Sequence, residues 1–191
     1  MDAHRNDDSV GRELRGFELA RRLIVHRVRT ETISKLTGLS RNRLATLRRR
    51  LGVPDDERHR GPPPRSLDVF LRTARGRTEG AAVAALFPLF KNAASRLPTY
   101  LDEGEQACDI YDAYLAYHPQ SNVRFEELML LKRSLSKGNL LELALCRVCR
   151  GLIMNNRYDR GRETCSHCDG LRVPEQDVAI HSDKRPAPGL R

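Results

Sequence analysis

Four of the five cysteines in this 191-residue sequence stand close together near its carboxyl end. They form two C-x2-C pairs, with fifteen residues between the pairs: Cys146 and Cys149, then Cys165 and Cys168. Thiols at this spacing suit three kinds of chemistry, which are a disulfide framework, thiol redox catalysis and the binding of a soft metal ion such as zinc.

The rest of the sequence favours reduced thiols without redox catalysis. Disulfides belong mainly to oxidising compartments, and the first sixteen residues are charged throughout, without the apolar run of a secretion signal. No stretch approaches the roughly 20 apolar residues of a membrane span. We therefore expect a cytoplasmic protein that does not enter the membrane. A redox C-x2-C motif normally occurs singly at the start of a helix in a βαβ unit, and this sequence has no such pattern.

Zinc fits the spacing best. Two C-x2-C turns supply the four ligands of a closed tetrahedral site, and four thiolates leave no open position for a reacting water. We predict one structural zinc ion per chain, while another soft metal or unliganded thiols remain alternatives. His167 is interpreted as a bystander, because four cysteines already complete the ligand set. Cys108, which stands alone in a helical pattern, is interpreted as a core residue.

The excess of positive charge is confined to the first part of the chain. The formal net charge is +9, from 34 Lys and Arg against 25 Asp and Glu. Residues 1–77 hold 19 basic and 10 acidic side chains, whereas residues 78–191 hold 15 of each. This asymmetry indicates that the first part meets a polyanion such as DNA and the second part meets protein. An arginine-rich surface that is merely solvated is the alternative.

Helical periodicity in the basic part predicts a helix-turn-helix. A first amphipathic helix is expected over residues 13–29, and a short one follows from Thr30, which would cap it. Gly38 permits a turn that Leu39 fills, and Ser40 caps a further helix over residues 41–51. The expected inward face of the first helix comprises Leu14, Phe17, Ala20, Leu23, Ile24 and Val28; that of the last comprises Leu44, Leu47 and Leu51.

The last of these helices carries the predicted DNA contacts. Its first residues, Arg41, Asn42 and Arg43, stand where a recognition helix meets base edges, and Arg and Asn suit the direct readout of guanine and adenine. Arg48, Arg49 and Arg50 at the other end are predicted to contact phosphates. Helical hairpins that do not bind DNA can share this pattern, so a purely structural role is the alternative.

The fold class expected from these patterns is mostly α. We expect a basic helical region at 1–54, a proline-rich linker at 55–66, a helical body at 67–140, a zinc-binding module at 141–172 and a disordered tail at 173–191. In the body we expect a helix within 80–97 that Pro88 kinks or starts, a helix ending before Pro119 and a helix over 124–143. No glycine-rich phosphate loop, metalloprotease motif or nucleophile elbow is present, so we predict that the protein is not an enzyme.

The order of these parts resembles the bacterial FlhC family, the C subunit of the flagellar master transcriptional activator. The resemblance covers roughly residues 14–170. It is clearest at L-S-R-x-R-L (Leu39–Leu44), Y-x-x-Y-L (Tyr111–Leu115) and the two cysteine pairs. It implies a mostly helical fold, zinc held by Cys146, Cys149, Cys165 and Cys168, and a heteromer with an FlhD-like subunit that binds promoter DNA and recruits RNA polymerase.

Two features depart from the family. The sequence has no tryptophan, whereas relatives carry several in the segment after the proline run, and it is richer in arginine. Relatives also switch on transfer genes of mobile elements, so both roles stay open. The expected function is a zinc-containing DNA-binding subunit that binds DNA poorly without its partner, to which the tyrosine- and leucine-rich second part would bind. A zinc-stabilised adaptor that binds only protein is the alternative.

Overall fold

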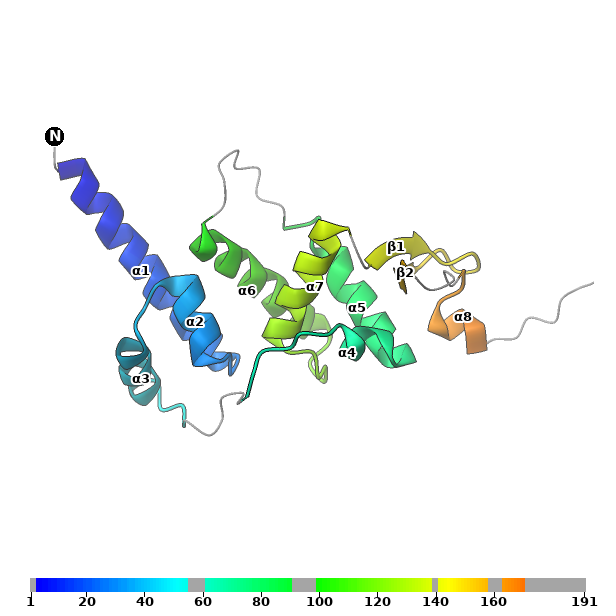
Figure 1. Cartoon of the computed structure of the whole chain (residues 1–191), viewed down its shortest axis with the longest axis horizontal. Coiled ribbons are helices and arrows are strands. Elements are labelled where there is room, and N and C mark those ends of the chain that lie inside the picture. Colours follow the sequence, from blue (N-terminus) through cyan, green and yellow to red (C-terminus); the bar gives the residue numbers. More distant parts are fainter. Residues whose placement is uncertain (1–2, 55–60, 91–98, 139–140, 158–162, 171–191) are drawn as a thin grey trace, which may run out of the picture.

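The chain is mostly helical, as predicted, and it also contains one small sheet, which was not predicted. The computed structural model describes residues 3–54, 61–90, 99–138, 141–157 and 163–170. Figure 1 labels the elements in chain order. They are α1 (Ala3–Val25), α2 (Thr30–Thr37), α3 (Arg41–Arg50), α4 (Asp68–Leu71), α5 (Ala74–Leu86), α6 (Tyr100–Tyr117), α7 (Phe125–Lys137), β1 (Leu141–Leu145), β2 (Leu152–Asn156) and α8 (Ser166–Gly170).

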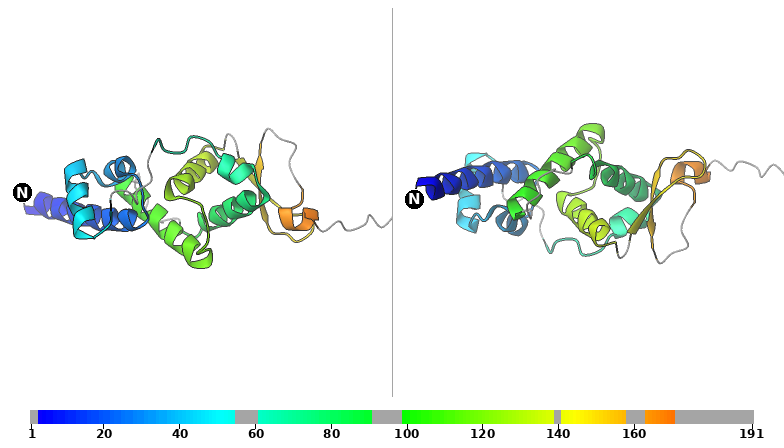
Figure 2. Two further views of the ribbon diagram at one scale, coloured as in Figure 1. Left: turned by 90° about the horizontal axis from the view of Figure 1, so that it is seen from below. Right: turned by 90° about the horizontal axis from the view of Figure 1, so that it is seen from above.

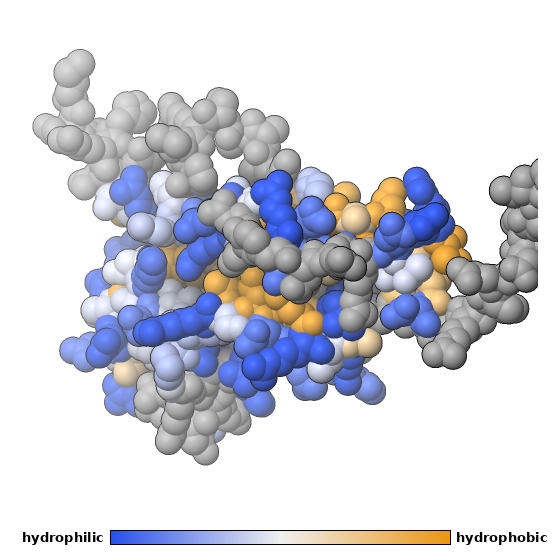
Figure 3. Space-filling model, turned by 45° about the vertical axis from the view of Figure 1, so that its right-hand side comes forward, coloured by the Kyte–Doolittle hydropathy of each residue, from blue (hydrophilic) through white to orange (hydrophobic). Residues whose placement is uncertain are grey.

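The elements are arranged along the length of the molecule. Helices α1 to α3 lie at one end, α4 to α7 form the middle, and the hairpin of β1 and β2 lies with α8 at the other end (Figures 1 and 2). One hydrophobic core runs through these parts, from Leu19 of α1 to Met154 of β2. Hydrophobic side chains also reach the surface, near the middle of the face in Figure 3 and again toward the end with the hairpin.

Helix α1 begins far earlier than the predicted residue 13 and ends at Val25. Its first turns extend beyond α2 and α3 (Figure 1). Leu14 is therefore 65% exposed, and the prediction that it faces the core is wrong. The periodicity identified an apolar face correctly, but none of the described helices covers that face at Leu14. Val28 is buried as expected, although it lies after the end of the helix.

The turns between the N-terminal helices follow the predictions closely, with one exception. Gly38 ends α2 with a φ of 74°, which favours glycine, and the Ser40 side chain accepts a hydrogen bond from the Arg43 N–H. Leu39 is buried between these helices. Thr30 is not a cap: it is the first residue of α2, and Arg29 occupies the cap position without a side-chain cap hydrogen bond.

The helices of the body differ from prediction where the sequence contains proline or changes to a strand. Helix α5 ends at Leu86, before Pro88, which lacks the N–H that a helix interior needs, and residues 91–97 of the expected helix lie outside the described residues. Helix α6 ends before Pro119, as predicted. Helix α7 ends at Lys137 and is capped by Gly138, whose φ is 63°, and the predicted extension to residue 143 is wrong because β1 begins at Leu141.

Helices α1 and α6 are joined by an apolar centre and charged edges. Gly104 lets them approach closely, since a Cβ there would lie 2.7 Å from Leu19 Cδ2. Arg22 donates to Asp109 at 2.8 Å and to Asp112 at 2.5 Å. Exposed ion pairs at the edge of an interface add little to the free energy of unfolding, but they help to align the two helices. The basic helices are thus fixed on the body.

The predicted linker and tail lie largely outside the described residues. Residues 55–60 and 171–191 are not described, and residues 61–66, with three prolines, contain no helix or strand. Arg29 Nε donates to the Gly61 carbonyl oxygen at 3.1 Å, so the described end of the proline segment contacts the N-terminal helices. In the part of the chain that is described, no helix combines the length and the apolar character needed to cross a membrane.

Candidate metal centre and basic helical surface

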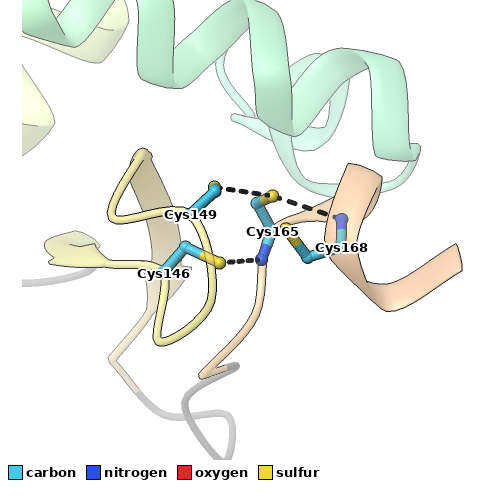
Figure 4. Close-up of side chains that lie close together, drawn as sticks. All are labelled: Cys146, Cys149, Cys165 and Cys168. Atoms are coloured by element: carbon cyan, nitrogen blue, oxygen red, sulfur yellow. Dashed lines mark hydrogen bonds between the residues drawn. The ribbon is translucent and has the colours of Figure 1, made fainter. Parts of the chain in front are cut away.

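A β-hairpin, which was not predicted from the sequence, positions the first cysteine pair. Strands β1 and β2 pair antiparallel, from Leu141 opposite Asn156 to Leu145 opposite Leu152. The Cys146 N–H donates to the Gly151 carbonyl at 2.8 Å and the Arg150 N–H donates to the Cys146 carbonyl at 3.0 Å, which closes the C-x2-C turn. Arg150 adopts a φ of 61° there. The turn directs both sulfur atoms to one side of the hairpin (Figure 4).

The second pair comes from α8 and the residue before it. Cys165 precedes the helix and Cys168 lies within it. The Arg147 N–H donates to the Glu163 carbonyl at 2.8 Å, and their side chains form an ion pair. These contacts hold the two C-x2-C segments against each other, with their side chains converging (Figure 4). Sequence spacing gave no signal of this pairing between Arg147 and Glu163.

The four sulfur atoms form a cluster that could hold a metal ion. All four Sγ atoms lie within 4.8 Å of one another, and those of Cys149 and Cys165 are 3.7 Å apart. Zinc–sulfur bonds of about 2.3 Å in a tetrahedron require sulfur atoms roughly 3.8 Å apart. All five cysteines are free, and 3.7 Å far exceeds a disulfide bond of about 2.05 Å. The donor set therefore fits a soft divalent ion, whereas the disulfide alternative is wrong.

Backbone N–H groups already favour thiolate at two of the sulfurs. Hydrogen bonds from the N–H groups of Cys149 and Cys165 lower the pKa of Cys146 to about 6. A hydrogen bond from the N–H of Cys168 lowers the pKa of Cys165. The Cys165 sulfur, by contrast, raises the pKa of the Cys168 thiol to about 12. Like charges oppose complete ionisation of the set, so a bound cation is what would allow four thiolates together.

Cys108 lies apart from this cluster, as predicted. It is completely buried in α6, and burial is the main reason that its thiol pKa is raised to about 12. His167 is exposed and is not part of the four-cysteine group.

We expect Cys108 to resist alkylation by iodoacetamide at pH 8 in the folded chain. Four pH units below its pKa, only about one thiol in 10⁴ is ionised, and the thiolate is the reactive form. A brief labelling pulse followed by mass mapping would measure this, with the same pulse in guanidinium as the control. Native labelling of Cys108 as fast as in guanidinium would contradict its place in the core.

The predicted DNA contacts fall into three environments on α3. Arg41, Asn42, Arg49 and Arg50 are exposed. Arg43 is exposed but held: it donates to Glu13 at 2.6 Å, and its guanidinium lies 5.7 Å from the centre of the Phe17 ring. Arg48 is only 2% exposed and donates to the Val28 carbonyl at 2.8 Å.

Arg48 is therefore a correction to the sequence interpretation. Its position on the helix directs it toward the segment between α1 and α2, where it is too buried to be available to a phosphate. The exposed face of α3 also includes two small residues, Ala45 and Thr46, which were not predicted as DNA contacts. Because they follow the inward-facing Leu44 by one and two residues, helical spacing could have placed them on the outer face.

The tyrosines of the second part, which was expected to bind the partner, also lie in different environments. Tyr111 and Tyr114 are buried in the core, where their hydroxyl groups bond to Val123 and Ser121. Tyr117 is 80% exposed.

Comparisons with protein-family models and with curated proteins find no match to the chain.

Proposed function

We propose that this chain is the DNA-binding subunit of a heteromeric transcriptional activator, similar to FlhC, with a structural zinc ion at its four-cysteine cluster. Helices α2 and α3 act as the helix-turn-helix, and α3 is the recognition helix. The partners are promoter DNA, an FlhD-like subunit and RNA polymerase. The regulated genes are flagellar genes or transfer genes of a mobile element.

The exposed face of α3 is the observation that carries this proposal. Asn42, Thr46 and Arg49 recur there at helical spacing, and Ala45 lies beside them. Small side chains let a helix approach the base edges closely, Asn suits adenine, and a Thr or Ala methyl suits the methyl group of thymine. The Arg48 contact to the Val28 carbonyl and the Ser40 cap hold this helix in a fixed orientation.

The closed sulfur site supports a structural role for zinc. Four cysteine ligands leave no position for a water or substrate, so zinc would fold the hairpin and α8 without taking part in a reaction. The module packs on the body through β2: a Cβ on Gly80 of α5 would lie 2.6 Å from the Met154 methyl. Zinc binding would thereby stabilise the end of the body as well.

The protein-only adaptor remains the second candidate. It is favoured by three apolar side chains of the module that are exposed, Leu143, Leu145 and Val148. Promoter binding separates the two functions, because an adaptor would leave DNA affinity unchanged when α3 is altered.

We expect Arg49→Met to weaken binding to promoter DNA, measured by fluorescence anisotropy in the presence of the FlhD-like subunit. The loss of one phosphate contact should reduce the slope of log K against log salt by about 1. Arg48→Met is expected instead to lower the thermal midpoint, because it removes a buried contact between helices.

Arg72→Met is the matched control. Arg72 is an exposed arginine of the body, outside the basic helices, and its replacement should leave the salt slope unchanged. Equal salt slopes for the wild type and Arg49→Met would contradict the DNA-binding role of α3.

A further inference from the structure

Helix α1 carries an exposed apolar stripe on the turns that extend beyond α2 and α3. Val10 is 58% exposed and Leu14 is 65% exposed. Together with Phe17 they follow an i, i+4, i+7 spacing, which places them on one face of the helix. Exposed leucine and valine are ordinary when single, but a stripe at helical spacing is the surface that a partner helix covers.

The stripe leads into a groove between α1 and α3. The groove has a volume of about 340 Å³ and is lined by Phe17, Asn42, Arg43, Thr46, Leu47 and Arg50. Phe17 and Leu47 are partly buried and pack against the core, so they form an apolar floor. The groove and the stripe together are called the α1/α3 groove below. Its floor could receive large apolar side chains projecting from one face of a helix.

The charges around the α1/α3 groove are mainly positive. Arg43 and Arg50 are among its lining residues, and Arg12 and Arg41 are exposed on the same two helices. Arg43 is paired with Glu13 at 2.6 Å, so these two charges offset each other, and Arg12, Arg41 and Arg50 supply the remaining positive charge. An occupant with carboxylates beside its apolar face would complement this rim.

We propose that the α1/α3 groove is the docking site for an acidic amphipathic helix of the partner protein. This inference rests on the heteromer proposed above and adds the surface and the chemistry of the partner. A second copy of this chain fits less well, because a symmetric pair would bring the arginines of one rim toward those of the other. DNA would be attracted by the arginines but gains little from the stripe of Val10 and Leu14.

Docking in this groove leaves the side of α3 with Ala45 and Arg49 open to DNA, whereas Asn42 and Thr46 of the proposed DNA face line the groove itself. At 100° per residue, Ala45 lies about 160° around the helix from Arg43. The side of α3 toward α1 therefore differs from the side that carries Ala45 and Arg49. A helix in the groove would also hold α1 against α3, which would limit movement of the recognition helix. Because Asn42 and Thr46 belong to both surfaces, partner docking and DNA binding are expected to change each other's affinity.

The test uses the full chain and two labelled helical peptides of about 18 residues. Both peptides present the same leucine face, and one is flanked by glutamates and the other by lysines. By fluorescence anisotropy, the glutamate peptide is expected to bind at least about tenfold more tightly than the lysine peptide. Leu14→Ser should weaken the glutamate peptide about tenfold or more, as the loss of one buried leucine implies.

Leu89→Ser is the matched control, since Leu89 is exposed on the body at 76%, and it should leave peptide affinity unchanged. Equal affinities for the two peptides, or no effect of Leu14→Ser, would overturn the proposal. So would self-association of the chain that Leu14→Ser abolishes, because the occupant would then be a second copy. A loss of DNA affinity in Leu14→Ser without any peptide would make the stripe a DNA surface instead.

Promoter binding by the same proteins keeps this outcome separate from the proposed function. If Arg49→Met weakens DNA binding but the chain binds both peptides with equal affinity, the proposed docking site is wrong and the DNA-binding function stands. If the glutamate peptide binds through Leu14 but no variant of α3 changes DNA affinity, the groove is a docking site on a protein-only adaptor.

Discussion

Cys146→Ser is expected to remove metal binding and to unfold the hairpin and α8. Cys146 is the most enclosed member of the cluster: it is fully buried and accepts a hydrogen bond from the Cys165 N–H at 3.3 Å. Cys146 belongs to a second, small hydrophobic cluster, whose buried members among the described residues are Cys146, Ile153 and Cys168, with Ala144 and Cys165 partly buried. A core this small cannot support a folded module without another source of stability.

The expected effect is large because structural zinc contributes folding free energy directly, about 10–16 kcal/mol in zinc-finger peptides near neutral pH. Protein purified without chelator should contain one zinc per chain by elemental analysis. In Cys146→Ser, or after treatment with a strong chelator, amide hydrogens of β1 and β2 should exchange much faster than those of α6 and α7.

Cys108→Ala is the matched control for this experiment. It replaces a fully buried cysteine of the body, which lies outside the metal cluster. We expect it to retain the zinc content and the slow amide-hydrogen exchange of β1 and β2. A Cys146→Ser chain that retained both would show that neither a four-cysteine zinc site nor its stabilising role is correct.

Glu126→Leu is expected to destabilise the whole chain. The Glu126 carboxylate accepts hydrogen bonds from the Arg29 backbone N–H at 3.0 Å and lies 3.2 Å from its guanidinium. The two side chains are 4% and 8% exposed. Removing one member of a buried ion pair costs about 3–5 kcal/mol, because the remaining guanidinium loses the carboxylate that offsets its desolvation. Urea unfolding should show a lower midpoint with an unchanged slope.

Two further variants identify the cause of that loss. Arg29→Met combined with Glu126→Leu should recover part of the stability, because replacing both ions by apolar side chains removes both buried charges together. Glu18→Ala removes the carboxylate from an exposed pair with Arg21 and should leave the midpoint unchanged, since water screens such pairs. A midpoint for Glu126→Leu equal to that of the wild type would mean that the pair does not join α7 to the N-terminal helices.

The sequence by itself determined features that depend on near neighbours in the chain. Two C-x2-C pairs predicted the four-cysteine cluster. Each pair forms a local turn, and a four-ligand site requires only that the two turns come together. Ser40 and Gly38 predicted a helix start and a helix end, and Pro119 marked the end of α6. Caps and breakers act within a few residues, so their effects can be read along the sequence.

Only the tertiary structure decided which of the similar side chains are available. Arg48 and Arg49 are adjacent and alike in sequence, yet Arg48 is directed toward Val28 and Arg49 toward solvent. Leu14 and Ile24 both belong to apolar positions of α1, yet only Ile24 lies where other helices cover it. Periodicity defines a face of a helix, whereas burial depends on whether a segment distant in sequence packs there.

The strands after α7 show the same limit. LLELALC continues a leucine-rich helical pattern, and short apolar runs do not distinguish a helix from a strand. Gly138 ends α7, and β1 is then stabilised by pairing with β2 and by contacts of the hairpin with α5 and α7. Those hydrogen-bond partners lie beyond the cysteine turn, so the strand exists only because the folded hairpin supplies them.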